Sequence, residues 1–238
     1  MITQEQIQIL ANKYQTTELN IRREYLQHLF LSYFYQQPET TKIYFKGGTA
    51  LKILYGSPRF SEDLDFNSGA TEFKNIERAL LSTLLEIERE GIKINLNEAK
   101  KTSGGYLAVI EGYLPEKLTI QLQISWRRKK SKPQLVTAVN DFVPTYTLIG
   151  LSTEQLIGEK IQALFARRLP RDFYDLYFAL RANLLSPDQK KSLPRLLILI
   201  RKTKINFAKE LRSFLPKSHW LIVKDFKETL KQETQRFV

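Results

Sequence analysis

The sequence predicts an α+β chain with a mixed core at residues 1–150 and a helical C-terminal domain at residues 151–238. Two observations carry this prediction. Apolar residues repeat with both helical and strand-like periods up to about residue 150, whereas the repeat is helical nearly throughout from Ser152 onward. Four prolines punctuate this second part, as expected between short helices. A chain of 238 residues is long enough to bury a core in each part.

The first part of the chain alternates between the two kinds of element. Residues 3–36 predict two helices, and a one-sided apolar pattern predicts another helix at about 72–90. The expected strands lie at 92–96, 106–111 and 118–125. These elements are sufficient for a sheet covered by helices.

A glycine turn after the first strand-like run is a candidate phosphate site. The apolar run at 43–45 predicts a buried strand, and Gly47 and Gly48 then let the backbone turn sharply and approach a ligand closely. Thr49 is expected to cap the helix that follows. Because a helix N-terminus presents unpaired amides, Gly47, Gly48 and Thr49 are candidate ligands of a nucleotide phosphate.

A pair of aspartates follows this turn on a second predicted strand. On a strand, residues two apart share a face, so Asp63 and Asp65 point together while Leu64 and Phe66 point into the core. Two adjacent carboxylates repel each other unless a cation lies between them. Hard divalent ions bind such oxygens and share their remaining positions with substrate phosphates. Asp63 and Asp65 are therefore candidate ligands of Mg²⁺ or Mn²⁺, with a nucleoside triphosphate as substrate.

Composition excludes several classes of chemistry. The absence of cysteine excludes disulfides, thiolate metal sites and cysteine nucleophiles. No apolar run approaches the roughly 18–20 residues of a membrane span. The first residues lack the basic and apolar pattern of a signal peptide, so we expect a cytoplasmic protein with no membrane partner.

The charge balance favours a polyanionic partner. A net charge of +12 attracts nucleic acid, although a charge run is more often a solvated surface. Beside a predicted phosphate site, the excess of basic residues favours RNA. The candidate RNA-binding residues are Arg127, Arg128, Lys129, Lys130, Arg167 and Arg168.

Two sequence blocks carry a resemblance to a known family. GGTALKILYG at 47–56 followed by RFSEDLDF at 59–66 resembles the first motif of the AbiEii/AbiGii-type nucleotidyltransferase toxins, which include the MenT toxins. A second block at 152–180 places Lys160 on a helix before an Arg-Asp-x-x-Asp segment at 171–175, as in that family. These toxins belong to the DNA polymerase β-like nucleotidyltransferase superfamily.

The resemblance implies a fold and an activity. The fold would be a polymerase β-like nucleotidyltransferase core with a mixed sheet, followed by the helical domain. The activity would be metal-dependent transfer of NMP from an NTP to RNA, at the 3′ end of tRNA, which blocks translation. Lys160 would neutralise the triphosphate, and Asp172 and Asp175 would complete the catalytic set. A toxin of a toxin–antitoxin or phage-defence system also implies a cognate antitoxin.

The sequence departs from the superfamily at the position of a third carboxylate. Residues 118–125 alternate between apolar and polar side chains, and the polar positions nearest to the expected site are Gln121 and Gln123. An amide neither binds a second metal well nor accepts a proton. The alternatives are that Asp172 or Asp175 serves instead, that the site has fewer metal ligands, or that activity is lost. Glu111 and Glu116 are further possible substitutes.

Two other functions keep the predicted fold. The acceptor of the nucleotide would be a protein or a small molecule in the first, although the positive charge of the chain disfavours a cationic small molecule. In the second, the chain is a non-catalytic nucleotide-binding or RNA-binding protein, which the missing third carboxylate would explain.

Overall fold

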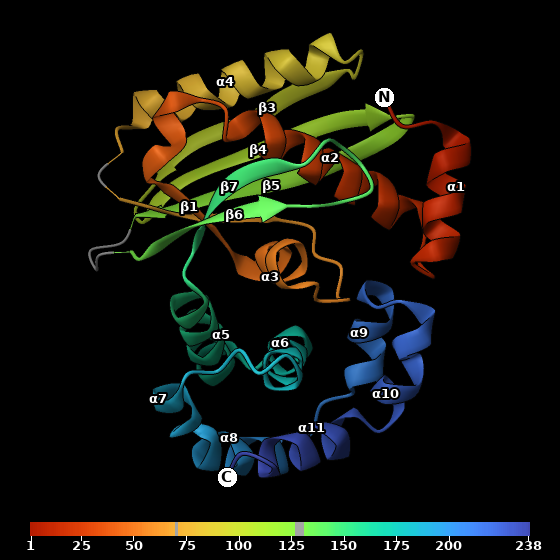
Figure 1. Ribbon diagram of the computed structural model, residues 1–238, viewed down its shortest axis with the longest axis vertical. Coiled ribbons are helices and arrows are strands. Elements are labelled where there is room, and N and C mark those ends of the chain that lie inside the picture. Colours follow the sequence, from red (N-terminus) through yellow and green to blue (C-terminus); the bar gives the residue numbers. More distant parts are fainter. Residues whose placement is uncertain (70, 127–130) are drawn as a thin grey trace. The chain divides into compact units, whose positions relative to one another are not determined.

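The computed structural model describes residues 1–69, 71–126 and 131–238, and its helices and strands are shown in Figure 1. Contacts divide the chain into two compact units. The core unit comprises Met1–Gly56 and Phe60–Leu151, and the helical unit comprises Ser57–Arg59 and Ser152–Val238. The mixed sheet of the first and the helices of the second confirm the predicted α+β class.

The core unit contains helices, strands and one 3₁₀ turn. Its helices are α1 (Gln4–Lys13), α2 (Glu18–Phe34), α3 (Gly47–Tyr55) and α4 (Phe73–Arg89), with the 3₁₀ turn at Pro38–Lys42. Its strands are β1 (Ile43–Lys46), β2 (Leu64–Ser68), β3 (Ile94–Thr102), β4 (Gly105–Leu114), β5 (Glu116–Trp126), β6 (Pro133–Ala138) and β7 (Tyr146–Leu151).

The described strands form one mixed sheet in the order β3-β4-β5-β2-β1-β7-β6. The pairs β2–β5 and β1–β7 are parallel, and the other neighbours are antiparallel. The sequence did not predict β6 and β7. Strand β6 is an edge strand that begins with Pro133 and leaves Leu135 76% exposed, so it lacks the buried apolar alternation that marks a strand.

An aromatic core fixes the orientation of β2. Helix α2 packs beside α4, and α3 and α4 lie on opposite sides of the sheet (Figure 1). Phe66 of β2 lies 5.4 Å from Phe34 of α2 and 5.4 Å from Phe45 of β1, measured between ring centroids. Because all three rings are buried, β2 cannot rotate its other face inward without exposing Phe66.

A buried histidine lies in the same unit, under the β6–β7 connection. His28 of α2 is 3% exposed, its Nδ1 lies 2.9 Å from the Tyr146 hydroxyl, and its ring stacks on Phe142 at 5.4 Å. Burial lowers the pKa of His28 to about 3, and the Lys52 ammonium adds to this effect. The histidine is therefore a neutral packing residue near pH 7.

The helical unit is built around a second aromatic cluster. Its helices are α5 (Thr153–Arg167), α6 (Pro170–Arg181), α7 (Pro187–Lys190), α8 (Leu193–Lys202), α9 (Phe207–Phe214), α10 (Trp220–Lys224) and α11 (Phe226–Gln235), with a 3₁₀ turn at Lys217–His219. Phe207 contacts Phe173 at 5.3 Å and Phe226 at 5.0 Å between ring centroids, and Tyr174 stacks on Phe226. In the part of the chain that the structure describes, no helix is long and apolar enough to cross a membrane.

Candidate active site

The glycine turn between β1 and α3 contacts one of the two predicted metal ligands. Gly47 has a φ of +88°, and a Cβ at this position would lie 2.3 Å from Oδ2 of Asp65. Only glycine fits both the backbone conformation and this contact. The chain therefore packs the backbone of the turn directly against the Asp65 carboxylate, in agreement with the β1–β2 register that pairs Lys46 with Asp65.

The two aspartates occupy the accessible side of β2. Leu64 and Phe66 are fully buried, whereas Asp65 is half-buried and Asp63 is exposed. Strand β2 begins at Leu64, so Asp63 immediately precedes it. Since residues two apart share a face of an extended chain, the buried neighbours direct both carboxylates to the same side.

Thr49 holds the chain just before β2 and does not cap α3. The residue at the N-cap is Lys46 and α3 begins at Gly47, so Thr49 is the third residue of the helix. The buried Thr49 hydroxyl donates a hydrogen bond to the backbone carbonyl of Asp63 at 2.5 Å. Thr49 thereby ties the first turn of α3 to the backbone of a candidate metal ligand, which corrects the predicted capping role.

The position opposite Asp65 in the sheet holds an amide. Strand β5 runs parallel to β2 with Gln123 in register with Asp65, and Gln121 lies two residues earlier on the same face. Gln123 is exposed. Gln123, one of the two amides that the sequence offers in place of a third carboxylate, is therefore the direct neighbour of Asp65 in the sheet.

The two glutamates considered as substitutes lie too far along the sheet. Glu111 of β4 pairs with Thr119, four residues before Gln123, which corresponds to about 13 Å along the strand. Glu116 is seven residues before Gln123, or about 23 Å. In addition, Glu111 forms an ion pair with Lys117, which lowers the pKa of that carboxyl through their hydrogen bond. Neither glutamate can join the carboxylates of β2.

The helical unit contains a buried cluster of one carboxylate and two cations. Asp175 of α6 is 1% exposed and accepts hydrogen bonds from Nε and Nη2 of Arg59 at 2.8 and 3.2 Å. Nζ of Lys160, on α5, lies 2.7 Å from Oδ2 of Asp175, the oxygen that also accepts from Nη2 of Arg59. Burial alone would raise the pKa of Asp175, but Arg59 and Lys160 outweigh it and hold the pKa below its usual value. Asp175 is therefore an anion that fixes the position of Lys160.

Asp172 stabilises the start of α6. Its buried carboxylate accepts hydrogen bonds from Nε and Nη2 of Arg167, at 2.7 to 3.0 Å, and from the backbone N–H of Leu169 at 3.1 Å. An acid at the first turn of a helix also interacts favourably with the helix dipole. The structure therefore directs the oxygens of Asp172 to Arg167 and to the helix N-terminus.

The predicted RNA-binding residues have different surroundings. Arg127, Arg128, Lys129 and Lys130 lie outside the described residues. Arg167 is engaged with Asp172, whereas Arg168 is exposed and ends α5 in a left-handed conformation with a φ of 57°. Of this set, Arg168 is the described residue whose guanidinium faces solvent without a carboxylate partner.

The donor set on β2 fits a hard divalent cation. Among the residues that the structure describes, no group of three or more His, Cys, Asp or Glu side chains is arranged to hold a metal ion. Asp63 and Asp65 nevertheless offer two carboxylates on one accessible face beside a glycine turn. Mg²⁺ is commonly bound by one or two carboxylates together with water and substrate phosphates, so this set is sufficient when the nucleotide supplies the other ligands.

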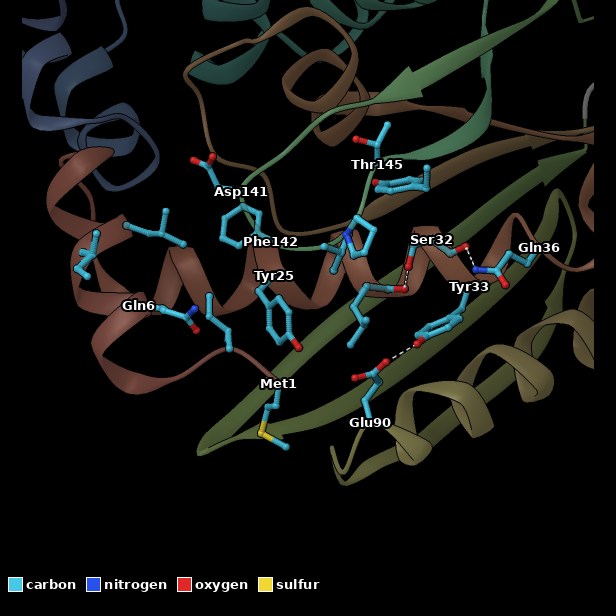
Figure 2. A pocket seen from close by; sticks show the side chains of 17 residues that line it. Met1, Gln6, Tyr25, Ser32, Tyr33, Gln36, Glu90, Asp141, Phe142 and Thr145 are labelled. Atoms are coloured by element: carbon cyan, nitrogen blue, oxygen red, sulfur yellow. Dashed lines mark hydrogen bonds between the residues drawn. The ribbon is translucent and has the colours of Figure 1, made fainter.

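A cavity elsewhere in the core unit has the wrong chemistry for a nucleotide. It has a volume of about 540 Å³ and is lined by α1, α2 and the β6–β7 connection, including Tyr25, Tyr33 and Phe142. Figure 2 shows Glu90 at its rim, accepting a hydrogen bond from the Tyr33 hydroxyl at 2.5 Å. The described lining residues include two acids, Glu90 and Asp141, and neither lysine nor arginine. Little positive charge is therefore available there to bind a triphosphate.

Solved structures share this fold. The crystal structure of JHP933 from Helicobacter pylori matches with a TM-score of 0.68 and 21% identity, covering 93% of each chain. MenT4, a nucleotidyltransferase toxin from Mycobacterium tuberculosis H37Rv, matches with a TM-score of 0.63 and 14% identity, covering 100% of this chain and 93% of that one. No curated protein matches the sequence. At these identities the likeness establishes that this chain shares the fold of these two proteins.

The family follows from the sequence itself. Residues 29–236 match the model of the AbiEii family, described as the nucleotidyl transferase AbiEii toxin of a type IV toxin–antitoxin system. Because the match spans most of the 238 residues, the chain belongs to this family and is a nucleotidyltransferase of the toxin type. The resemblance predicted from the two sequence blocks is confirmed.

Proposed function

We propose that this nucleotidyltransferase transfers NMP from an NTP to the 3′ end of tRNA in a reaction that requires Mg²⁺ or Mn²⁺, and that this modification blocks translation. The observation that supports the proposal is the contact of the Gly47 turn, at the N-terminus of α3, with the side chain of Asp65. The charge of +12 supports a polyanionic acceptor.

The core unit would bind the outer phosphates and the metal. The first amides of α3, at Gly47, Gly48 and Thr49, have no partner within the helix and favour a phosphate at this end. Asp63 and Asp65 would hold the divalent ion. When bound, such an ion stabilises negative charge on the transferring phosphoryl group and on the leaving pyrophosphate.

Lys160 would supply positive charge for the triphosphate. The Lys160 ammonium is 12% exposed and is oriented by Asp175, so its position is set before substrate binds. A lysine held in this way neutralises phosphate charge without first losing side-chain freedom. Asp172 and Asp175 would act by positioning Arg167, Arg59 and Lys160.

The proposed chemistry is an in-line displacement. The terminal hydroxyl of the acceptor attacks the α-phosphorus, a new oxygen–phosphorus bond forms, and the bond to the bridging oxygen of the β-phosphate breaks. Pyrophosphate carries away the bonding electrons. The hydroxyl proton passes to solvent, because the Gln123 amide opposite Asp65 is not a base.

A family of toxins in type IV toxin–antitoxin systems also implies a restraint on this activity. We include a cognate antitoxin in the proposal as the partner that limits damage to the host. Nothing in the proposed chemistry requires the antitoxin for transfer, so the purified toxin should act alone.

The test is transfer of label from each α-³²P NTP to total tRNA in the presence of Mg²⁺. Labelled tRNA whose label disappears in Asp65→Asn and after chelation of the metal would support the proposal. Asp188→Asn is a matched control, since this exposed aspartate pairs only with Lys191 among the described residues. Label on a protein or a small molecule, with none on tRNA, would show that the acceptor is not tRNA but that the chain is a nucleotidyltransferase.

A further inference from the structure

A small cavity in the helical unit is lined by three cations. Its volume is about 220 Å³, and its lining residues are Arg168, Leu199, Lys202, Thr203, Lys204 and Ile205. These residues come from the end of α5 and from the segment that leaves α8. The cavity is separate from the Asp175 cluster, none of whose members lines it.

The arginine in this cavity has an unfavourable backbone conformation. Arg168 ends α5 with φ 57° and ψ 39°, the left-handed region that glycine adopts most easily at a helix end. A residue other than glycine or asparagine there is strained, and such strain concentrates at functional sites. Glycine would adopt this backbone conformation without strain but has no side chain, so an arginine at this position indicates a role for its guanidinium group.

Helix dipoles do not account for three cations. Arg168 and Lys202 each lie at a helix C-terminus, where a basic residue stabilises the negative end of the dipole. Each terminus carries about half a negative charge, so two termini amount to about one negative charge. Arg168, Lys202 and Lys204 carry three positive charges, which leaves an excess of about two.

Carboxylates do not neutralise the excess either. In the described chain, Arg168, Lys202 and Lys204 have no ion pair, although other cations of this unit do. Arg167 pairs with Asp172, and Lys231 pairs with Glu228. Arg168, Lys202 and Lys204 are all exposed, and three unpaired positive charges around one cavity raise the local positive potential and favour the binding of an anion there.

The rest of the lining suits a sugar–phosphate backbone. Leu199 and Ile205 give the cavity apolar walls, and the Thr203 hydroxyl donates to the carbonyl of Leu199 at 2.9 Å, which leaves its oxygen able to accept. A cluster of cations beside apolar walls and an acceptor matches a phosphate flanked by ribose.

We propose that Arg168, Lys202 and Lys204 bind a backbone phosphate of the RNA acceptor, at a distance from its reacting end. This inference rests on the proposed function and adds the place where the RNA is held. Arg168 follows Lys160 by eight residues on the same helix, or about 12 Å along its axis. At about 3.4 Å per nucleotide in a duplex strand, this corresponds to three or four nucleotides.

The experiment measures binding of fluorescein-labelled tRNA to the full chain by anisotropy, between about 50 and 200 mM KCl. Lys202→Gln/Lys204→Gln should weaken binding by roughly tenfold, and each lost phosphate contact should reduce the salt slope by about 0.7–0.9. The matched control is Lys191→Gln/Lys231→Gln, which removes two cations that are each paired with an acid three residues away. Equal effects in both double variants would overturn the proposal, because only the net charge would then matter.

A glycine substitution separates binding from structure. Arg168→Gly removes the guanidinium and relieves the left-handed strain, so we expect weaker tRNA binding together with an equal or higher melting temperature. An unchanged affinity, or a fall in both quantities, would assign Arg168 a structural role.

Two further arms distinguish this inference from the proposed function and from other phosphates. An RNA acceptor too short to reach the cavity from its reacting end should receive label equally from wild type and from Lys202→Gln/Lys204→Gln. If wild type transfers no label to any RNA, the proposed function is refuted and the inference about binding is not. If wild type and Lys202→Gln/Lys204→Gln bind tRNA with equal affinity, the inference is refuted and the proposed function is not. If Lys202→Gln/Lys204→Gln weakens the binding of tripolyphosphate and leaves the affinity for tRNA unchanged, the cavity binds the phosphates of a nucleotide and not those of the RNA.

Discussion

The two pairs of aspartates in this chain have the same chemistry and opposite surroundings. Asp65 lies half-buried on the accessible face of β2, and Asp63, immediately before this strand, is exposed. Asp172 and Asp175 are each 1% exposed, and each accepts hydrogen bonds from an arginine. A carboxylate that binds a metal and substrate must be reachable, whereas one that positions a cation is best buried. This difference in exposure supports the proposed division of the four acids into metal ligands and positioning residues.

The largest expected effect tests the accessible pair. Loss of a group that only supports a metal ligand already costs up to about a hundredfold, so Asp65→Asn, which removes a proposed direct ligand, should reduce nucleotide transfer by more than about a hundredfold. Because Asp65 is only half-buried, the melting temperature should change little. Transfer rates at saturating Mg²⁺ and a thermal melt measure the two quantities. A large loss of stability with little loss of activity would place Asp65 in a structural role.

The buried pair should respond in the opposite way. Asp175→Asn leaves Arg59, which is 4% exposed, and Lys160 without their shared anion, so the free energy of unfolding should fall by about 3–5 kcal/mol. Urea unfolding, followed by Trp220 fluorescence in a Trp126→Phe background, reports on the helical unit. If Asp175→Asn is as stable as wild type but inactive, Asp175 contacts substrate and the proposed division is wrong.

The buried His28 should make the stability of the core unit sensitive to acid. The unfolded state binds a proton at His28 near pH 6.5, whereas the folded state resists protonation down to about pH 3, so stability is complete above 6.5 and declines by up to about 1.4 kcal/mol per pH unit between these values. The lowered pKa of Asp175 has its effect later, because its stabilisation is lost only as pH falls below the usual aspartate value of 3.8.

Fluorescence of Trp126 in a Trp220→Phe background measures the core unit in urea at each pH. The contribution between pH 6.5 and 3 should disappear in His28→Asn. An unchanged slope in that variant would show that other groups account for the acid sensitivity.

The smallest expected effect concerns the neighbour of Asp65. Gln123→Glu places a like charge directly opposite this aspartate, which should cost about 0.2–1 kcal/mol without metal. Mg²⁺ should remove this penalty, and its apparent affinity should rise by up to roughly tenfold. Thermal melts with EDTA and with Mg²⁺ measure both effects. A penalty that persists at saturating Mg²⁺ would show that position 123 does not face the ion.

Much of the core motif was predictable because it is local. The buried–exposed alternation of Leu64, Asp65 and Phe66 follows from the two-residue period of a strand, and the glycine turn follows from residues adjacent in sequence. The structure corrected one local detail. Thr49 was expected to cap α3, but the two glycines before it entered the helix and moved the cap to Lys46.

What the sequence alone determined is the set of elements, the motif and the family, because periodicity, turn residues and spacing act between near neighbours. Only the tertiary structure decided that Gln123 lies opposite Asp65, and that Arg59 bonds Asp175 across 116 residues. Strands β6 and β7 were likewise missed. Distant segments pair only where their contacts offset the entropy lost when the long loop between them closes. The local sequence pattern does not contain this information.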